Sequence, residues 1–175
     1  MSNIVLMGLR GSGKSAIGSA LAARLGWEFV DTDELVERTA GRSVAEIFAR
    51  DGEPRFREFE SDALRAALAG DRRVVSIGGG AVLAPANRER LRAAAVCVWL
   101  TAPPAELLRR IAADPRSVAQ RPPLTTRSPL EELTHLADNR NPLYAELASH
   151  TIATEGRALE QLVDDIMRRL RNAHA

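Results

Sequence analysis

The sequence predicts an α/β domain in which a five-stranded parallel sheet lies between two layers of helices. Short apolar runs alternate along the chain with longer segments of helical periodicity, as in sheets built from strand–helix–strand units. A glycine-rich loop joins the first run to the first helical segment, and polar or glycine residues directly follow the second and third runs. Because the chain has 175 residues, 45% of them hydrophobic, we expect a single domain over residues 1–175.

The individual elements follow from two periodicities. Strands are predicted where short, mainly apolar runs occur, at residues 2–7, 28–31, 74–77, 96–100 and 150–153. Helices are predicted where apolar residues recur at helical spacing, at residues 17–25, 44–50, 56–68, 105–112, 130–147 and 159–170.

The segment at residues 114–129 differs from the rest of the chain. It contains four prolines and shows no apolar periodicity. A connection of this length without secondary structure is uncommon in a compact domain unless it has a function. We therefore predict a lid over the active site at residues 113–127.

Residues 8–15, with the sequence GLRGSGKS, fit the phosphate-binding pattern G-x-x-x-x-G-K-[ST]. Its glycines let backbone N–H groups converge on phosphates, and the following helix N-terminus adds partial positive charge. The alternative is a glycine-rich turn with a surface lysine. The strand–loop–helix context argues against it, and Lys14 is the only lysine among 24 lysine and arginine residues. The predicted nucleotide contacts in this loop are Gly11, Ser12, Gly13, Lys14, Ser15 and Ala16.

Lys14 and Ser15 have distinct expected roles. An ammonium is a compact charge on a flexible stem, and it can follow β- and γ-phosphates where a planar guanidinium does not fit. We predict that Lys14 is catalytic and stabilises charge on the transferred phosphoryl group. The hydroxyl of Ser15 is placed to bind Mg²⁺.

Two carboxylates, Asp31 and Asp33, follow the second predicted strand. The carboxyl ends of parallel strands meet at one edge of a sheet, so both should lie near the phosphate loop. Asp31 would contact Mg²⁺ through water, and Asp33 would accept a hydrogen bond from a substrate hydroxyl and orient it for attack. Helix N-capping is the alternative role for Asp33.

The third predicted strand is followed by Gly78, Gly79 and Gly80, which permit close approach of a ligand to the backbone. A tight turn is the alternative. Two arginines, Arg57 and Arg140, are candidate ligands for a substrate carboxylate, which guanidinium binds with two hydrogen bonds. Either one taken alone is more typical of a solvent-exposed position. Glu60 lies three residues after Arg57 and should hold its side chain in place if the segment is helical.

Composition excludes several function classes. A net charge of +1 gives no overall basic field for nucleic acid or a membrane surface. The single cysteine, Cys97, lies in an apolar run and is expected to be buried and unreactive. The three histidines lack metal-ligand spacing. Since the first strand begins at the N-terminus and no stretch reaches membrane-spanning length, we expect a cytoplasmic protein, and a monomer.

Taken together and in this order, these motifs resemble those of shikimate kinase over nearly the whole chain. The resemblance is carried by the motifs GLRGSGKS at 8–15, DTD at 31–33, GRSVAEIF at 41–48, GE at 52–53, FREFE at 56–60, GGG at 78–80, RP at 121–122 and RNPLY at 140–144. The family transfers the γ-phosphate of ATP to the 3-hydroxyl of shikimate. It has a P-loop fold like that of nucleoside monophosphate kinases, with a five-stranded parallel sheet, a helical substrate-binding region and a lid.

The resemblance implies specific roles for residues of this chain. The substrate-binding region would span residues 32–62, and shikimate would contact Asp33, Arg57, Arg140 and the backbone of Gly79.

For ATP, the resemblance implies that the lid residue Arg121 reaches the phosphates as a catalytic residue and that Arg157 lies near the adenine. The lid reads Arg121-Pro122-Pro123-Leu124 where many family members have Arg-Pro-Leu-Leu.

Two other functions remain open at this point. A gluconate kinase, or another small-molecule kinase of the same fold, would share the phosphate loop and a carboxylated, hydroxylated substrate. A catalytically silent nucleotide-binding module would share the fold, but it should have lost Lys14, Asp33 or Arg121, all of which this chain retains.

Overall fold

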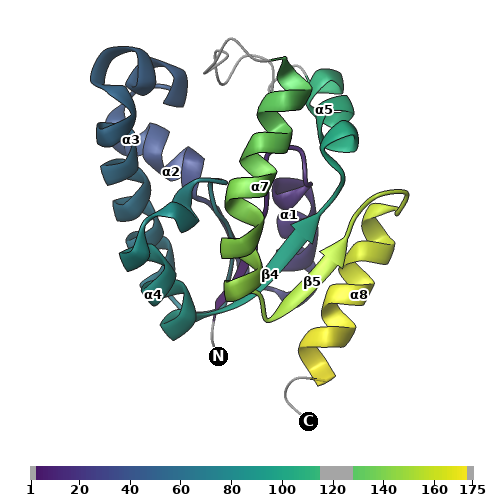
Figure 1. Cartoon of the computed structure of the whole chain (residues 1–175). Helices are drawn as coiled ribbons and strands as arrows, with labels where there is room; N and C mark the ends of the chain where they lie inside the picture. Colours follow the sequence, from purple (N-terminus) through teal and green to yellow (C-terminus); the bar gives the residue numbers. More distant parts are fainter. Residues whose placement is uncertain (1–2, 115–127, 173–175) are drawn as a thin grey trace.

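A computed structural model describes residues 3–114 and 128–172 of the chain. Within these ranges, five strands form one sheet in the order β2-β3-β1-β4-β5, and all of its pairings are parallel (Figure 1). The strands are β1 (Asn3–Met7), β2 (Glu28–Asp31), β3 (Arg73–Ser76), β4 (Ala95–Thr101) and β5 (His150–Ala153). The predicted fold class is confirmed, and the central position of β1 places the loop that follows it at the middle of the sheet edge.

Helices cover both faces of the sheet (Figure 1). They are α1 (Lys14–Leu25), α2 (Thr32–Ala40), α3 (Val44–Leu68), α4 (Pro85–Ala94), α5 (Pro104–Ala113), α7 (Pro129–Leu147) and α8 (Leu159–Asn172), with a short 3₁₀ turn, η1 (Ala81–Leu83). Helices α1 and α8 pack on one face, whereas α3, α4, α5 and α7 pack on the other.

Strand β1 divides the core into two halves because alternate side chains of a strand point to opposite faces. Ile4 and Leu6 join the apolar cluster under α1 and α8. Val5 and Met7 join the cluster on the opposite face, together with Cys97. The expectation that Cys97 is buried is confirmed, and burial raises the pKa of its thiol to about 11, which favours the protonated form.

Some element boundaries differ from those predicted, for identifiable reasons. The helices expected at 44–50 and 56–68 are two parts of α3, which bends at Gly52, where φ is 78° and ψ is 172°. Helix α4 was not predicted, since Leu91 and Asn87 are its only buried residues and give no apolar stripe. Helix α2 was also not predicted, because it buries only Thr32 and Val36 and so shows no apolar stripe either.

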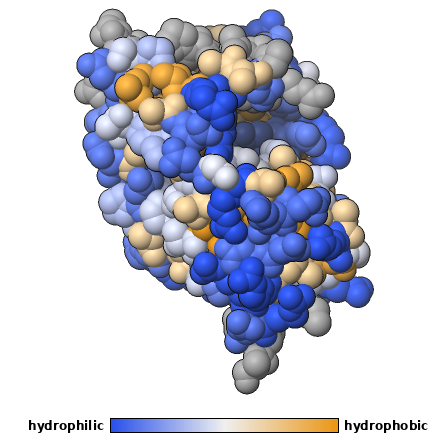
Figure 2. Space-filling model, turned by 90° about the vertical axis from the view of Figure 1, so that its right-hand side faces the viewer, coloured by the Kyte–Doolittle hydropathy of each residue, from blue (hydrophilic) through white to orange (hydrophobic). Residues whose placement is uncertain are grey.

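The predicted lid, at 113–127, lies almost entirely outside the described residues. None of the helices in the described part of the chain is long and apolar enough to cross a bilayer. On the face of the molecule shown in Figure 2, hydrophobic residues form small patches separated by hydrophilic ones.

One histidine of the fold makes stability depend on pH. His150 begins β5, and its Nε2 atom is withdrawn from solvent without a hydrogen-bond partner among the described residues. Burial, and then the nearby Arg169, lower the pKa of His150 below its ordinary value of 6.5. As the pH falls below 6.5, the unfolded chain binds a proton that the folded chain resists, so stability should decrease there and be fully present above it.

We expect the variant His150→Gln to lose part of this decrease, because glutamine does not titrate. Urea unfolding of both proteins between about pH 5 and pH 8 measures the difference. The control is His135→Gln, which changes an exposed histidine of α7 and should keep the wild-type pH dependence. Identical pH profiles for the wild type and His150→Gln would contradict this assignment.

Candidate active site

The loop between β1 and α1 has a conformation that favours glycine. Gly11 and Gly13 have φ angles of 82° and 92°. A Cβ on Gly11 would lie 2.9 Å from the carbonyl oxygen of Leu107, so the loop also packs closely against α5. Helix α1 then begins at Lys14 without a side-chain cap. Its first N–H groups and its dipole therefore suit an anion such as a phosphate.

The side chain of Lys14 folds back over this loop. Its Nζ atom donates hydrogen bonds to the carbonyl oxygens of Gly8 (2.9 Å) and Leu9 (3.1 Å). These bonds hold the ammonium beside the N-terminus of α1 and at the wall of a large cleft. The positive charge and the backbone N–H groups thus face the same ligand position.

Asp31 connects the phosphate loop to the start of α2. Its Oδ2 atom accepts a hydrogen bond from the hydroxyl of Ser15 (3.0 Å), and its Oδ1 atom accepts one from the backbone N–H of Asp33 (2.9 Å). Asp31 is therefore the N-cap of α2. The capping role considered for Asp33 belongs to Asp31, and the carboxylate of Asp33 faces the cleft instead.

Gly78, Gly79 and Gly80, which we call the glycine strip, follow β3 and leave room for side chains from other elements. A Cβ on Gly78 would lie 2.6 Å from Oε1 of Glu60 and 2.9 Å from Oδ1 of Asp33. Its own N–H donates to the hydroxyl of Thr32 (3.2 Å). Gly78 thus leaves room for Asp33 beside it, and both residues line the large cleft.

The rest of the glycine strip accommodates the two predicted arginines. A Cβ on Gly79 would lie 3.2 Å from Nη1 of Arg140 and 3.3 Å from the hydroxyl of Tyr144. A Cβ on Gly80 would overlap the guanidinium of Arg57. These glycines are needed for space, since neither has a positive φ angle. The strip brings Arg57 and Arg140 together, although they lie far apart in the sequence.

Two acidic side chains hold Arg57 against the strip. Its Nη1 atom donates to Glu60 (2.6 Å), which is 1% exposed, and its Nη2 atom donates to Glu53 (2.9 Å). Burial opposes the charge on Arg57, but the neighbouring carboxylate of Glu60 and then that of Glu53 raise its pKa above the ordinary value. The expected pairing of Arg57 with Glu60 is confirmed.

Tyr144 fixes the middle of the glycine strip, a role that the sequence analysis did not assign to it. Its hydroxyl donates to the carbonyl oxygen of Gly79 (2.6 Å), and its side chain is fully buried. Burial raises its pKa to about 12, so the hydroxyl stays protonated and keeps donating. The available signal was its position four residues after Arg140, on the same face of α7.

Two adjoining pockets result from this arrangement. The larger, of about 650 Å³, is lined by Lys14, Ser15, Asp31, Asp33 and Arg140, among others. The smaller, of about 440 Å³, contains the predicted residues Ser12 and Arg157. Gly13, Ala16 and Arg110 line both. The predicted site residues in the described part of the chain therefore line one or other of these two pockets, except Arg57 and Gly80, which line neither.

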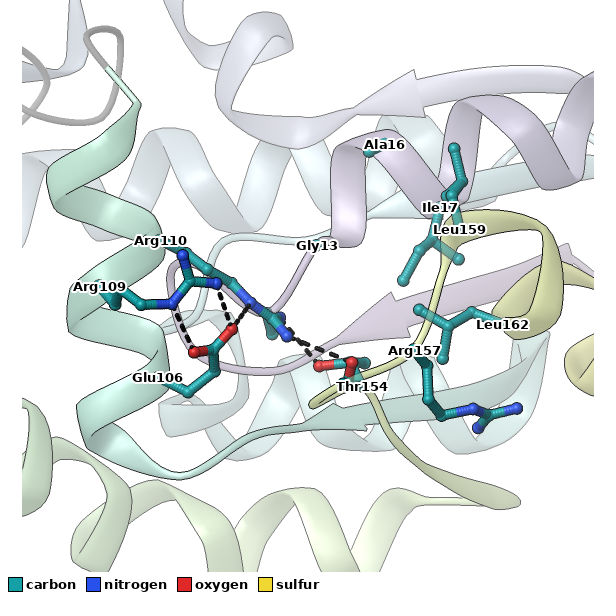
Figure 3. A pocket seen from close by; sticks show the side chains of 12 residues that line it. Gly13, Ala16, Ile17, Glu106, Arg109, Arg110, Thr154, Arg157, Leu159 and Leu162 are labelled. Carbon is teal, nitrogen blue, oxygen red and sulfur yellow. Dashed lines mark hydrogen bonds and ion pairs between the residues drawn. The ribbon is translucent and has the colours of Figure 1, made fainter.

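Arg157 lines the smaller pocket, but its charged end points away from it (Figure 3). The guanidinium donates to Asp165 of α8 (3.2 Å) and to the carbonyl oxygens of Ala153 and Gln161 (both 3.3 Å). It is thus the stem of Arg157 that borders the pocket. Arg121 lies outside the described residues.

The comparisons with known proteins agree with this geometry. The family model for shikimate kinase matches residues 10–171. A shikimate kinase of Symbiobacterium thermophilum is 49% identical over 168 residues, which are 96% of this chain and 95% of that protein.

Comparison with solved structures distinguishes members of the same family from proteins that share only the fold. Shikimate kinase from Acinetobacter baumannii in complex with shikimate superposes with a TM-score of 0.92 at 34% identity, covering 99% of this chain and 94% of that chain. A gluconokinase from Sinorhizobium meliloti reaches a TM-score of 0.59 at 20% identity, covering 98% of this chain and 93% of that one. The second likeness extends to the fold alone, and the chain belongs to the shikimate kinase family.

Proposed function

We propose that this protein transfers the γ-phosphate of ATP to the 3-hydroxyl of shikimate, giving shikimate 3-phosphate and ADP. One observation carries the proposal: Lys14 of the phosphate loop and the pair Asp33 and Arg140 line the same cleft. Phosphoryl transfer depends mainly on positioning and charge stabilisation, and a cleft that holds both substrates supplies these.

The phosphate loop supports the nucleotide half of the proposal. The N–H groups of residues 11–16 would bind the phosphates at the uncapped start of α1. The ammonium of Lys14 would neutralise charge that develops on the γ-phosphoryl oxygens. The base would occupy the smaller pocket, whose wall includes Ile17, Leu159 and Leu162.

Ser15 and Asp31 suit a magnesium ion bound together with ATP. Their oxygens lie 3.0 Å apart beside the phosphate loop, and hard oxygen ligands are those that Mg²⁺ prefers. Among the described residues, no group of three or more acidic, histidine or cysteine side chains is arranged so that it could hold a metal ion. This fits an ion held by one or two protein ligands, phosphates and water. When bound, Mg²⁺ would neutralise phosphate charge.

The glycine strip supports the part of the proposal that concerns shikimate binding. Arg57 and Arg140 would bind the carboxylate of shikimate with charge-assisted hydrogen bonds. Asp33 would accept hydrogen bonds from the ring hydroxyls and orient the 3-hydroxyl toward the γ-phosphate. The backbone at Gly79 and Gly80 would contact the ring, because no side chain intervenes there.

The remaining parts of the proposal concern the whole molecule. We propose a single kinase domain with a substrate-binding region at residues 32–62. The lid, at residues 113–127, would bring Arg121 to the phosphates as a third catalytic residue beside Lys14 and Asp33. The partners would be ATP and shikimate, for a monomer acting in the cytosol, where ATP is available.

An ADP-release assay with shikimate, gluconate and nucleoside monophosphates, run in parallel, tests the function. We expect turnover with shikimate to exceed that with each other acceptor by at least about a hundredfold, because the site pairs two arginines with Asp33. Faster turnover with gluconate would identify a gluconate kinase. ADP binding without turnover of any acceptor would identify a silent module.

We expect Arg140→Ala to raise KM for shikimate by about 10- to 100-fold, because each charged contact to a carboxylate contributes roughly 1.5–3 kcal/mol. KM for ATP should change far less. Arg140→Lys is the matched variant, since it keeps the charge but loses the planar pair of donors, and it should give an intermediate KM. Steady-state kinetics with each substrate varied in turn measures these values. An equal rise in both KM values would point to a structural role for Arg140.

For Asp33→Asn, the amide keeps the shape of the carboxylate but binds the substrate hydroxyl proton weakly. We expect kcat to fall about 100-fold or more while thermal stability changes little. Asp31→Asn serves as a comparison that should also lower helix stability, because Asp31 caps α2. Thermal melting and steady-state kinetics on the same preparations separate the two effects. A loss of stability without a loss of kcat in Asp33→Asn would contradict the proposed role.

A further inference from the structure

A three-residue ionic cluster on α5 borders the smaller pocket (Figure 3). The carboxylate of Glu106 accepts hydrogen bonds from Arg109, through Nε (2.7 Å) and Nη2 (2.8 Å), and from Nε of Arg110 (2.7 Å). The Glu106 side chain is only 15% exposed. Hydrogen bonds from Arg109, and then from Arg110, lower the pKa of Glu106 to about 2, so it remains ionised at neutral pH.

The two arginines of this cluster differ in what else they contact. Arg110 reaches across to Thr154, donating to its hydroxyl (2.9 Å) and to its carbonyl oxygen (3.2 Å), and to the carbonyl oxygen of Gly11 (3.3 Å). Arg109 is mostly exposed, and Glu106 is the one acceptor recorded for it among the described residues. Only Arg110 therefore joins α5, the phosphate loop and the end of β5.

The hydrogen bonds of Arg110 restrict how it can meet a ligand. A guanidinium has five N–H donors in one plane, and four of those of Arg110 are directed at Glu106, Gly11 and Thr154. Thr154 is itself fixed, since its N–H and hydroxyl both donate to the carbonyl oxygen of Thr101, at 2.9 and 3.1 Å. Most of the edge of the guanidinium is thus occupied, and its two flat faces are the larger surface that remains for a ligand.

The position of Arg110 places the faces of its guanidinium where a ligand could pack against them. It lines both the smaller pocket and the cleft that contains Lys14. In Figure 3, the apolar side chains of Ile17, Leu159 and Leu162 lie across the smaller pocket from it. A planar guanidinium facing an apolar wall suits a flat aromatic heterocycle, which gains both stacking and cation–π attraction.

We propose that Glu106 is a positioning residue of the nucleotide site, whose carboxylate fixes the guanidinium of Arg110 so that its face, and not its N–H edge, meets the base. The inference rests on the proposed binding of ATP, but not on the identity of the phosphate acceptor. Without Glu106, the side chain of Arg110 keeps its bonds to Thr154 and Gly11 at Nη1 and Nη2 but loses the anchor at Nε. The guanidinium can then tilt, and the surface that the base rests on is lost.

The alternative is a purely electrostatic role, in which Glu106 offsets the charge of two nearby arginines. The two roles make opposite predictions for a ligand without a base. Loss of a positioning group should weaken binding of ADP and leave binding of inorganic tripolyphosphate unchanged. Loss of a negative charge should instead tighten the binding of both ligands, since both are anions.

We expect Glu106→Ala to raise the Kd for ADP about tenfold, as removal of such supporting partners does in other sites. The Kd for tripolyphosphate, measured by competition against ADP, should stay within about twofold. Glu106→Gln retains one acceptor oxygen for Arg110 and should restore part of the ADP affinity. Arg65→Ala is the control, because it removes an exposed arginine of α3 that pairs with Asp62 far from the pocket lining, and its Kd for ADP should stay within about twofold of wild type.

A double-mutant cycle isolates the route of the effect. In an Arg110→Ala background, replacing Glu106 by alanine should cause no further loss of ADP affinity, because Glu106 acts through Arg110. Calorimetry measures Kd, and circular dichroism checks the fold; if Glu106→Ala does not fold, Glu106→Gln decides. Unchanged or tighter ADP binding by Glu106→Ala, an equal effect of the control Arg65→Ala, or additive losses in the cycle would overturn the inference. So would absence of ADP binding by the wild type, whereas ADP binding without shikimate turnover would contradict only the proposed function.

Discussion

The candidate site depends on the absence of side chains at residues 78–80. Asp33, Arg57 and Arg140 come from three different helices, and each approaches a different glycine of the strip. A single methyl group at Gly78 or Gly80 would displace a carboxylate or a guanidinium from its present position. Close packing of polar groups against bare backbone is therefore what places them within reach of one small ligand. The parallel sheet contributes by ending β1, β2 and β3 at the same edge.

Two arginines near the site are held in place by hydrogen bonds to acceptors of the protein itself. Arg57 is bound by Glu60 and Glu53, and Arg110 by Glu106 and Thr154. A free arginine side chain has many rotamers, and ordering it on binding a ligand costs entropy. Where the protein has already ordered it, that cost is met during folding. Such preorganisation is the main means by which an enzyme stabilises charge in phosphoryl transfer.

The sequence predicted the motifs of the site well and their supporting contacts poorly. The sequence predicted a parallel sheet but not the order of its strands. The positions of Lys14, Asp31 and the glycine strip followed from their place after apolar runs. Arg110 and Thr154 are 44 residues apart in the sequence, and Tyr144 and Gly79 are 65 residues apart. No local sequence pattern therefore predicts either contact. Arg157 shows the same limit, because Asp165 on α8 determines where its guanidinium points. Helix α4 lacked a signal because it buries so few apolar side chains.

The choice of lysine at position 14, in a chain that otherwise uses arginine, has a geometric explanation. Its Nζ atom donates to two successive carbonyl oxygens, of Gly8 and Leu9, at 2.9 and 3.1 Å. A compact ammonium can donate in several directions from one point, whereas a guanidinium directs its donors within one plane from a larger group. The loop around Lys14 is closely packed, since a Cβ on Gly8 would lie 2.5 Å from the carbonyl oxygen of Leu100. A guanidinium at this position would have to displace the loop, and with it the backbone N–H groups that face the phosphates.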